Sequence, residues 1–150
     1  MKMIYRIATG ALALGLCGGM ILAIGALATE DLPPMQTYGN VSYISGGIGL
    51  DESTAVKAAK NDFTLSLLFA QTKRGEYLAD VNVSIRDKDG ALMLEAVSDG
   101  PMLLARLPAG IYKISAEHQG TVLAKTVRVD AKRVAHAVFV WQPAAKATID

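Results

Sequence analysis

The sequence predicts an all-β protein, folded as a small sandwich or barrel of short strands. Glycines in the second half of the chain recur about every ten residues, at Gly90, Gly100, Gly110 and Gly120. Apolar runs lie between these glycines, and several alternate strictly with polar residues, as in residues 81–86. Short alternating runs with a turn signal at such a step are typical of antiparallel sandwiches and barrels.

The N-terminus has the features of a secretory signal peptide over residues 1–28. Lys2 and Arg6 form a positively charged start, and a long uncharged apolar run follows them. A sequence of the A-x-A type ends at Ala28, which places the cleavage between Ala28 and Thr29. The apolar run is also long enough to span a bilayer, so an uncleaved membrane anchor is the alternative. We therefore expect a protein that is exported to the periplasm or secreted.

The charge balance argues against strongly charged partners. The 150 residues contain 15 basic and 14 acidic side chains. The mature chain would have a net charge of −1, because Lys2 and Arg6 leave with the signal peptide and no acid does. We therefore expect no binding of nucleic acid, and contact with a membrane only through an uncleaved signal segment. Cys17 is the only cysteine and lies in the signal peptide, so the mature chain has no internal disulfide.

A leader and a short helix are expected before the strands. Residues 29–50 are rich in proline and glycine and have no hydrophobic period, which predicts an extended leader with at most a short edge strand at 41–44. Residues 51–61 predict one short helix, capped by Asp51 or Ser53 and with a thin apolar stripe. We expect this helix before the first strand of the sandwich, across one of its open ends.

Residues 62–142 carry the strands of the sandwich, and residues 143–150 form a tail. Alternation assigns an inward face to most strands. The residues expected to point inward are Phe63, Leu65, Leu67 and Phe69, then Val81, Val83 and Ile85, Leu92 and Leu94, Tyr112, Ile114 and Ala116, Val127 and Val129, and Phe139 and Trp141. The run 102–107 is apolar at most positions, so its inward face stays open.

Two turns flank the apolar run 102–107. The first is made by Asp99, Gly100 and Pro101. The second is Leu107-Pro108-Ala109-Gly110, in which the proline presets φ and the glycine accepts a positive φ. Tyr112 follows this turn, and we expect it to be a buried corner tyrosine whose hydroxyl bonds to the backbone.

These segments resemble the carboxypeptidase regulatory-like domain. The matching residues are Val81-x-Val83-x-Ile85-x-Asp87-x-x-Gly90, Ser98-Asp99-Gly100 and Leu107-Pro108-Ala109-Gly110-x-Tyr112-x-Ile114. The resemblance covers residues 63–141 and implies a seven-stranded Greek-key β-sandwich of the transthyretin-like type, close to immunoglobulin-like sandwiches. The chain is also similar to small exported bacterial proteins that consist of this domain alone. That group has no assigned activity, so the resemblance implies no catalytic residue.

The catalytic and metal-binding patterns of related or exported proteins are not recognisable in this sequence. A zinc peptidase needs closely spaced ligands, and neither His118 nor His136 is followed by a second one. Hydroxyisourate hydrolases share the implied fold, but they use several histidines, an arginine and a C-terminal Tyr-Arg-Gly-Ser, whereas this chain has two histidines and a different ending. Residues 87–90 begin like a calcium loop but lack its later ligands, so a hairpin turn is expected. We therefore expect no metal, no cofactor and no enzymatic activity.

One segment of the leader is a candidate binding site. Gly46, Gly47 and Gly49 precede the helix and could cradle an anion on free amides, with Asp51 and Glu52 directly behind them. The alternative is that this segment is a flexible connector between the leader and the sheet.

These observations favour an exported, non-catalytic β-sandwich that binds an unknown protein partner or has a structural role in the cell envelope. Residues 46–59 are its candidate contact surface, because the sandwich needs them least. The alternative is a periplasmic domain that binds a small molecule or a carbohydrate at one end of the sandwich. Trp141 could serve such a sugar site if it were exposed.

Overall fold

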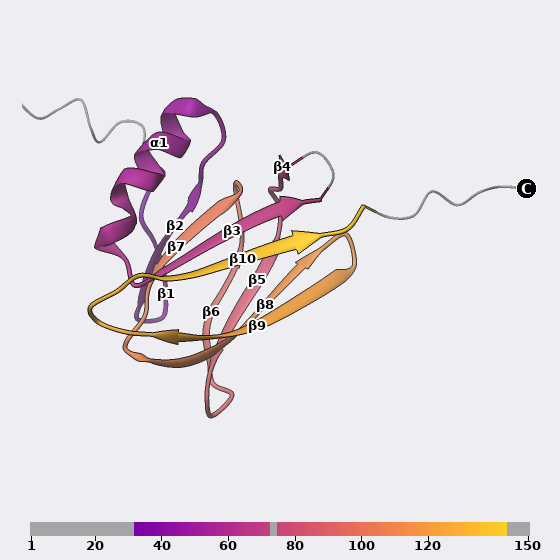
Figure 1. Ribbon diagram of the computed structural model, residues 1–150. Coiled ribbons are helices and arrows are strands. Elements are labelled where there is room, and N and C mark those ends of the chain that lie inside the picture. Colours follow the sequence, from indigo (N-terminus) through magenta and orange to yellow (C-terminus); the bar gives the residue numbers. More distant parts are fainter. Residues whose placement is uncertain (1–31, 73–74, 144–150) are drawn as a thin grey trace, which may run out of the picture.

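The structure is a computed structural model that describes residues 32–72 and 75–143. It consists of two β-sheets and one short helical segment (Figure 1). Its elements in chain order are β1 (Gln36–Tyr38), β2 (Val41–Gly46), α1 (Leu50–Ala59), the 3-10 turn η1 (Lys60–Asp62), β3 (Leu65–Gln71), β4 (Glu76–Tyr77), β5 (Asn82–Asp87), β6 (Leu92–Val97), β7 (Met102–Arg106), β8 (Gly110–His118), β9 (Thr121–Val129) and β10 (Ala135–Trp141).

The predicted signal peptide and the tail are not part of this description. Residues 1–28, with the cleavage pair Ala28 and Thr29, lie outside the described residues, and so do residues 144–150. Among the described residues, no helix is long and apolar enough to span a bilayer.

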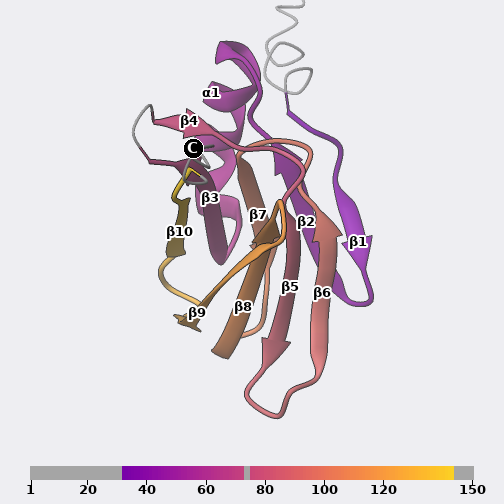
Figure 2. The same ribbon diagram turned by 90° about the vertical axis from the view of Figure 1, so that its right-hand side faces the viewer.

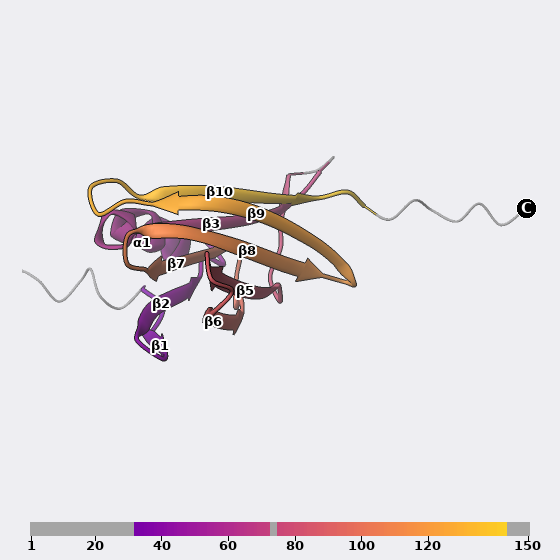
Figure 3. The ribbon, with the colours of Figure 1, turned by 90° about the horizontal axis from the view of Figure 1, so that it is seen from below.

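The two sheets confirm the predicted β-sandwich. The larger sheet has the order β1-β2-β7-β3-β10, with the short β4 also paired to β3. The smaller sheet has the order β6-β5-β8-β9 (Figure 2). All pairs are antiparallel except β3 and β10, which run parallel. Along the edges, β9 lies near β10 and β1 lies near β6, without pairing between the sheets (Figure 3).

The strands number ten rather than seven, partly because the leader is folded into the larger sheet. Strand β2 lies between β1 and β7, so it is an internal strand and not a short edge strand. The sequence predicted an extended leader, because its prolines and glycines interrupt the apolar residues that form strand β2. Val41 and Tyr43 point into the sandwich and Ile44 points to the opposite face. The helix therefore follows two strands instead of preceding the first one.

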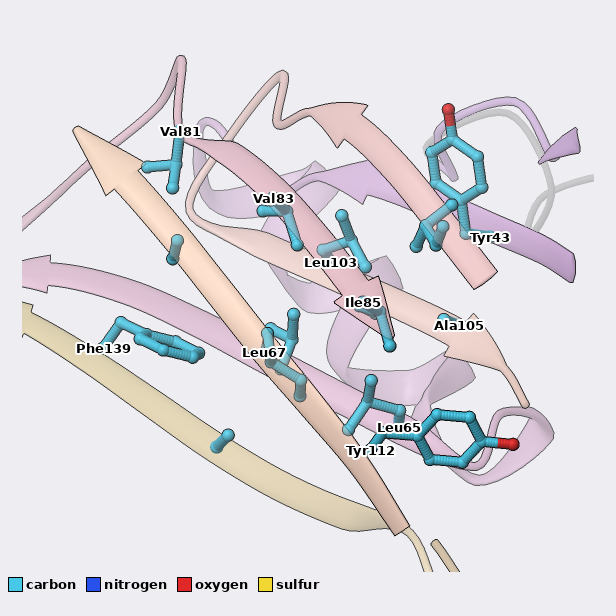
Figure 4. Packing of buried hydrophobic residues seen from close by; sticks show 14 of the residues in the cluster. Tyr43, Leu65, Leu67, Val81, Val83, Ile85, Leu103, Ala105, Tyr112 and Phe139 are labelled. Carbon is cyan, nitrogen blue, oxygen red and sulfur yellow. The ribbon is translucent and has the colours of Figure 1, made fainter. Parts of the chain in front are cut away.

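The core between the sheets is built by alternating apolar residues from both of them (Figure 4). Leu65, Leu67 and Phe69 of β3 meet Val83 and Ile85 of the opposite sheet in one buried cluster. The predicted inward faces of β5, β8 and β10 are confirmed. The expected partners Leu92 and Val127 are half-buried, because they lie on the edge strands β6 and β9.

Helix α1 covers the outer face of the larger sheet, not an open end of the sandwich. Its Val56 forms a second buried cluster with Ile44, Met102 and Leu104 of β2 and β7, and with Phe63. This explains why residues 102–107 show no alternation in the sequence. Leu103 and Ala105 face the inner core while Met102 and Leu104 face the helix, so both faces of β7 are buried.

The chain crosses from the smaller to the larger sheet at residues 98–101. The backbone of the buried Ser98 is hydrogen-bonded to Asp80 and Val81, directly before strand β5, and the Ser98 hydroxyl accepts the Val81 N–H at 3.0 Å. The next residue, Asp99, donates its N–H to Ser45 Oγ of β2 at 2.8 Å. Gly100 then lies directly on the backbone of Gly46. Successive residues of one turn therefore bind opposite sheets.

The second turn differs from its prediction in one detail. Gly110 does not have a positive φ, because β8 already begins there in extended conformation. The turn is held instead by Thr64, whose Oγ1 accepts the Leu107 N–H at 2.8 Å. The corner tyrosine is confirmed, since Tyr112 is buried and its hydroxyl donates to Pro108 O at 2.7 Å.

We predict that Gly100→Ala lowers the free energy of unfolding by about 1–3 kcal/mol, because the new Cβ would collide with the Gly46 backbone, which cannot rotate away. Gly110→Ala is the matched control. Its Cβ would meet the Tyr112 ring at an ordinary 3.6 Å, so its stability should change by less than about 0.5 kcal/mol. Urea unfolding followed by circular dichroism measures both, and equal losses in the two variants would contradict the close approach.

We predict that stability falls at alkaline pH through Tyr112. Burial, and secondarily the charge of Asp87, raise the pKa of this phenol above its ordinary value of 10.0. The neutral phenol is therefore favoured in the folded state, and its contribution is complete below pH 10.0 and is lost as the pH rises through the raised pKa. Tyr112→Phe should lose about 1 kcal/mol at pH 7 and show a smaller alkaline loss. Tyr43 accounts for part of what remains, because burial raises its pKa too. An unchanged alkaline slope would contradict the assignment.

Candidate functional site

Two of the three glycines in the predicted binding segment are not open to a ligand. Gly46 and Gly47 are buried, and Glu52 turns back toward them. The Glu52 carboxylate accepts the Gly47 N–H at 2.6 Å and the Ile48 N–H at 3.4 Å through one oxygen, Oε1. The protein's own carboxylate thus occupies the amides of residues 47 and 48, which the predicted anion site would use.

The start of helix α1 also differs from the prediction. Gly49 is the N-cap residue, and neither Asp51 nor Ser53 caps the helix with its side chain. Ser53 instead donates its hydroxyl to Leu50 O. Glu52, the third helical residue, supplies the anchor by reaching back to the amides before the helix, as the glutamate of a capping box does. A glutamate three residues after a glycine is the signal in the sequence that could have predicted this contact.

This arrangement exposes two large apolar side chains, Ile48 and Leu50, which we call the loop tip. Ile48 is 62% exposed and Leu50 is 80% exposed. Gly47 and Gly49 on either side of Ile48 have φ angles of +97° and +83°, which glycine adopts without strain. The loop tip is the part of the predicted segment 46–59 that a partner could reach.

A second apolar surface lies on the outer face of the larger sheet, and we call it the sheet strip. It consists of Leu68 and Ala70 of β3, Val138 and Val140 of β10, and Tyr77 of β4. The pairing places them side by side, because Leu68 is opposite Val138, and Ala70 is opposite both Val140 and Tyr77. Val138 and Val140 are each 42% exposed and Tyr77 is 61% exposed.

The sheet strip is exposed because helix α1 covers only one side of the sheet. The helix packs on β2 and β7, whereas β10 lies on the far side of β3 (Figure 1). A groove of about 120 Å³ separates the helix from β3. Lys57 and Lys60 line its helix side, and Leu68 and Ser66 line its sheet side. The apolar strip is therefore bordered by two positive charges.

The alternation in β10 indicated from the sequence that Val138 and Val140 point away from Phe139 and Trp141. It did not indicate that they lie beside Leu68 and Tyr77, because that depends on the pairing of β3 with strands far away in the chain. It also did not indicate where the helix ends on the sheet.

The two histidines are not brought together. His118 lies at the end of β8 against Trp141, with 5.8 Å between the ring centroids, and its buried Nδ1 has no hydrogen-bond partner among the described residues. His136 lies near the other end of β10, on the outer face. Within residues 32–72 and 75–143, no group of three or more His, Cys, Asp or Glu side chains is arranged to hold a metal ion.

Residues 87–90 form the expected hairpin turn. One carboxylate oxygen of Asp87, Oδ1, accepts the N–H groups of Asp89 and Ala91, each at 2.9 Å. Gly90 has a φ of +83°, as the turn requires.

No protein-family model matches the chain, and no curated protein matches it. Among solved structures 17 chains match. One is the 5-hydroxyisourate hydrolase of Klebsiella pneumoniae, which is 21% identical and has a TM-score of 0.44, with 55% of this chain and 92% of that chain covered. The match corrects one expectation. Since the named neighbour is an enzyme, the absence of enzymatic activity is not retained as a conclusion.

A similarity this low transfers no activity, and the assignment to a sandwich depends on the strand order described above. Membership of the carboxypeptidase regulatory-like family stays a prediction.

We predict that Glu52→Ala lowers the free energy of unfolding by about 1–2 kcal/mol, because two backbone amides lose their acceptor. Glu52→Gln keeps an acceptor oxygen and should lose less than half as much. Asp51→Ala, its exposed neighbour in the first helical turn, should change stability by less than about 0.5 kcal/mol. Thermal and urea unfolding measure all three, and an effect of Glu52→Ala no larger than that of Asp51→Ala would show that the contact does not anchor the loop.

Proposed function

We propose that the protein is an interaction module of the cell envelope that binds another protein through the sheet strip. The observation that carries this proposal is the continuous apolar row Val140–Ala70–Tyr77, which lies on a sheet face otherwise covered by a helix. Contiguous exposed apolar side chains with a polar border are typical of protein-binding surfaces. Export and the envelope location rest on the N-terminal sequence.

The composition of the strip suits an interface. Tyr77 offers a large apolar ring with a polar end, and tyrosine is enriched among the residues that dominate binding energy. The β-branched Val138 and Val140 lose little side-chain entropy when they are covered. All three lie on strands whose backbones are already ordered by pairing, so binding would cost little additional ordering.

The partner that fits this surface is an amphipathic helix with an acidic flank, packed beside α1. Neighbouring strands lie about 4.8 Å apart and a helix is about 10 Å wide, so β3 and β10 together offer the width of one helix. The groove between α1 and β3 is bordered by Lys57 and Lys60. No acidic side chain among the described residues lines this groove. Acidic residues on the partner would therefore complement the lysines while its apolar face covers the strip.

A carbohydrate site at Trp141 has no support in the geometry. The indole is buried against Phe69 and Phe139, with ring centroids 6.2 Å apart in both cases. Its Nε1 donates to Thr121 O at 3.0 Å. Both the face and the polar edge of the ring are thus used within the fold.

We predict that a photo-crosslinking amino acid at position 77 or 138 captures a partner in intact cells, whereas one at position 122 does not. Val122 is as exposed as Tyr77 but lies on β9 of the other sheet. The crosslinked peptide should come from an amphipathic helix with acidic residues. A crosslink at position 122 of equal yield, or a peptide without these features, would contradict the proposal.

Binding of the purified partner should weaken at least about tenfold in Val138→Asp, because a charge would be placed in an apolar contact. Val122→Asp is the matched control and should bind normally. Ile48→Asp tests the loop tip in the same assay. Loss of binding only in Ile48→Asp would move the interface from the strip to the loop tip and overturn the proposal.

A further inference from the structure

A separate cleft lies where the turn between β9 and β10 meets the start of β3. Figure 1 shows this turn beside the end of the helical segment. The cleft has a volume of about 440 Å³. Its polar and charged lining comes from Asn61, Thr64, Lys132, Arg133 and His136. None of these residues belongs to the sheet strip or to the loop tip.

The cleft is lined by cationic residues, and the acids nearest to it in the chain are not part of its lining. Asp130 precedes the turn, but its carboxylate accepts the Lys132 N–H at 2.9 Å and does not line the cleft. Asp62 follows Asn61, but it lines a different hollow beside α1. Among the described residues, no carboxylate lines the cleft. In a chain with almost balanced charge, this is a local excess of positive charge.

The side chains in the cleft offer complementary donors for an oxyanion. Arg133 carries a planar guanidinium that can bind two oxygens of a carboxylate or phosphate at once. Lys132 adds a point charge, and the Asn61 amide adds a neutral donor. Thr64 is not counted among these donors, because its hydroxyl is already hydrogen-bonded to the backbone of residue 107.

We propose that this cleft binds a small oxyanion, a phosphate or a carboxylate, with Arg133 and Lys132 as its main contacts and His136 as a contact that gains a proton on binding. The imidazole of His136 lines the cleft and is exposed to solvent, so it can take up this proton directly.

The proton uptake follows from the surroundings of His136. The side chain is exposed overall, but partial desolvation by its neighbours, and secondarily the charge of Lys60, lower the pKa of this imidazole below its ordinary value. The other charges at the cleft are Lys132 and Arg133, and the residue opposite His136 on β3 is the uncharged Ser66. All charged neighbours in the cleft are therefore positive and favour the neutral ring. A bound anion reverses this balance, so the pKa of His136 rises on binding and the affinity increases as the pH falls.

The test is a titration of the purified protein with inorganic phosphate and with citrate, at constant ionic strength set with chloride. The ring protons of His136 and the amide of Arg133 are followed by NMR. Saturable shifts are expected at both residues, with a lower dissociation constant at pH 6 than at pH 8. The two anions distinguish a preference for phosphate from one for carboxylate.

Three variants make the test specific. Arg133→Gln should weaken the binding about tenfold or more, because it removes a charged hydrogen-bond donor. His136→Gln should still bind the anion but lose the pH dependence. Lys113→Gln, an exposed lysine on the smaller sheet, should match the parent protein.

Two results would overturn the proposal. One is the absence of saturable shifts with both anions, which would mean that the cleft holds no anion. The other is an equal response in Arg133→Gln and the parent, which would mean that the shifts come from general ionic screening. Because no variant touches the strip, partner binding through Val138 stands or falls separately.

Discussion

The fold depends on the crossing between the two sheets at residues 98–101. Ser98 is hydrogen-bonded to Val81, which directly precedes β5 of the smaller sheet, and the next residue is hydrogen-bonded to Ser45 of the larger sheet. Gly100 then brings two backbones into direct contact. Both serines are buried, so each hydroxyl satisfies an amide that would otherwise be unpaired away from water. This short turn thereby sets how the apolar faces of the two sheets meet.

The larger sheet has to bury residues on both of its faces, and this requirement shapes the outside of the molecule. Its inner face closes on the smaller sheet, and half of its outer face closes on α1. A single helix of ten residues cannot cover all of its strands. The uncovered half still carries valines and a tyrosine, which are residues that sheets favour and that a partner can use. The same architecture that stabilises the fold therefore leaves an apolar surface beside the helix.

Positive and negative side chains lie on different surfaces around α1. The glutamate at its start anchors the preceding loop by accepting two of its backbone N–H groups. Lys57 and Lys60 line the side of the helix that faces the strip, and further cations gather in the turn before β10. Asp51 and Asp62 line a hollow elsewhere along the helix. A nearly neutral chain thus presents distinct local fields, which its net charge does not reveal.

The sequence alone was sufficient for the class of fold and for much of the core. Alternation at Val81, Val83 and Ile85 and at Phe139 and Trp141 assigned their inward faces correctly, because one buried face imposes a period of two. The corner tyrosine and the hairpin at Asp87 were predictable because their contacts lie within four residues. Only the tertiary structure decided that the leader enters the sheet as the internal strand β2 and which outward residues are covered. These features depend on contacts between segments far apart in the chain, or on where one helix happens to end. No local pattern encodes them, because the outward residues of a strand can be the same whether or not another element covers that face.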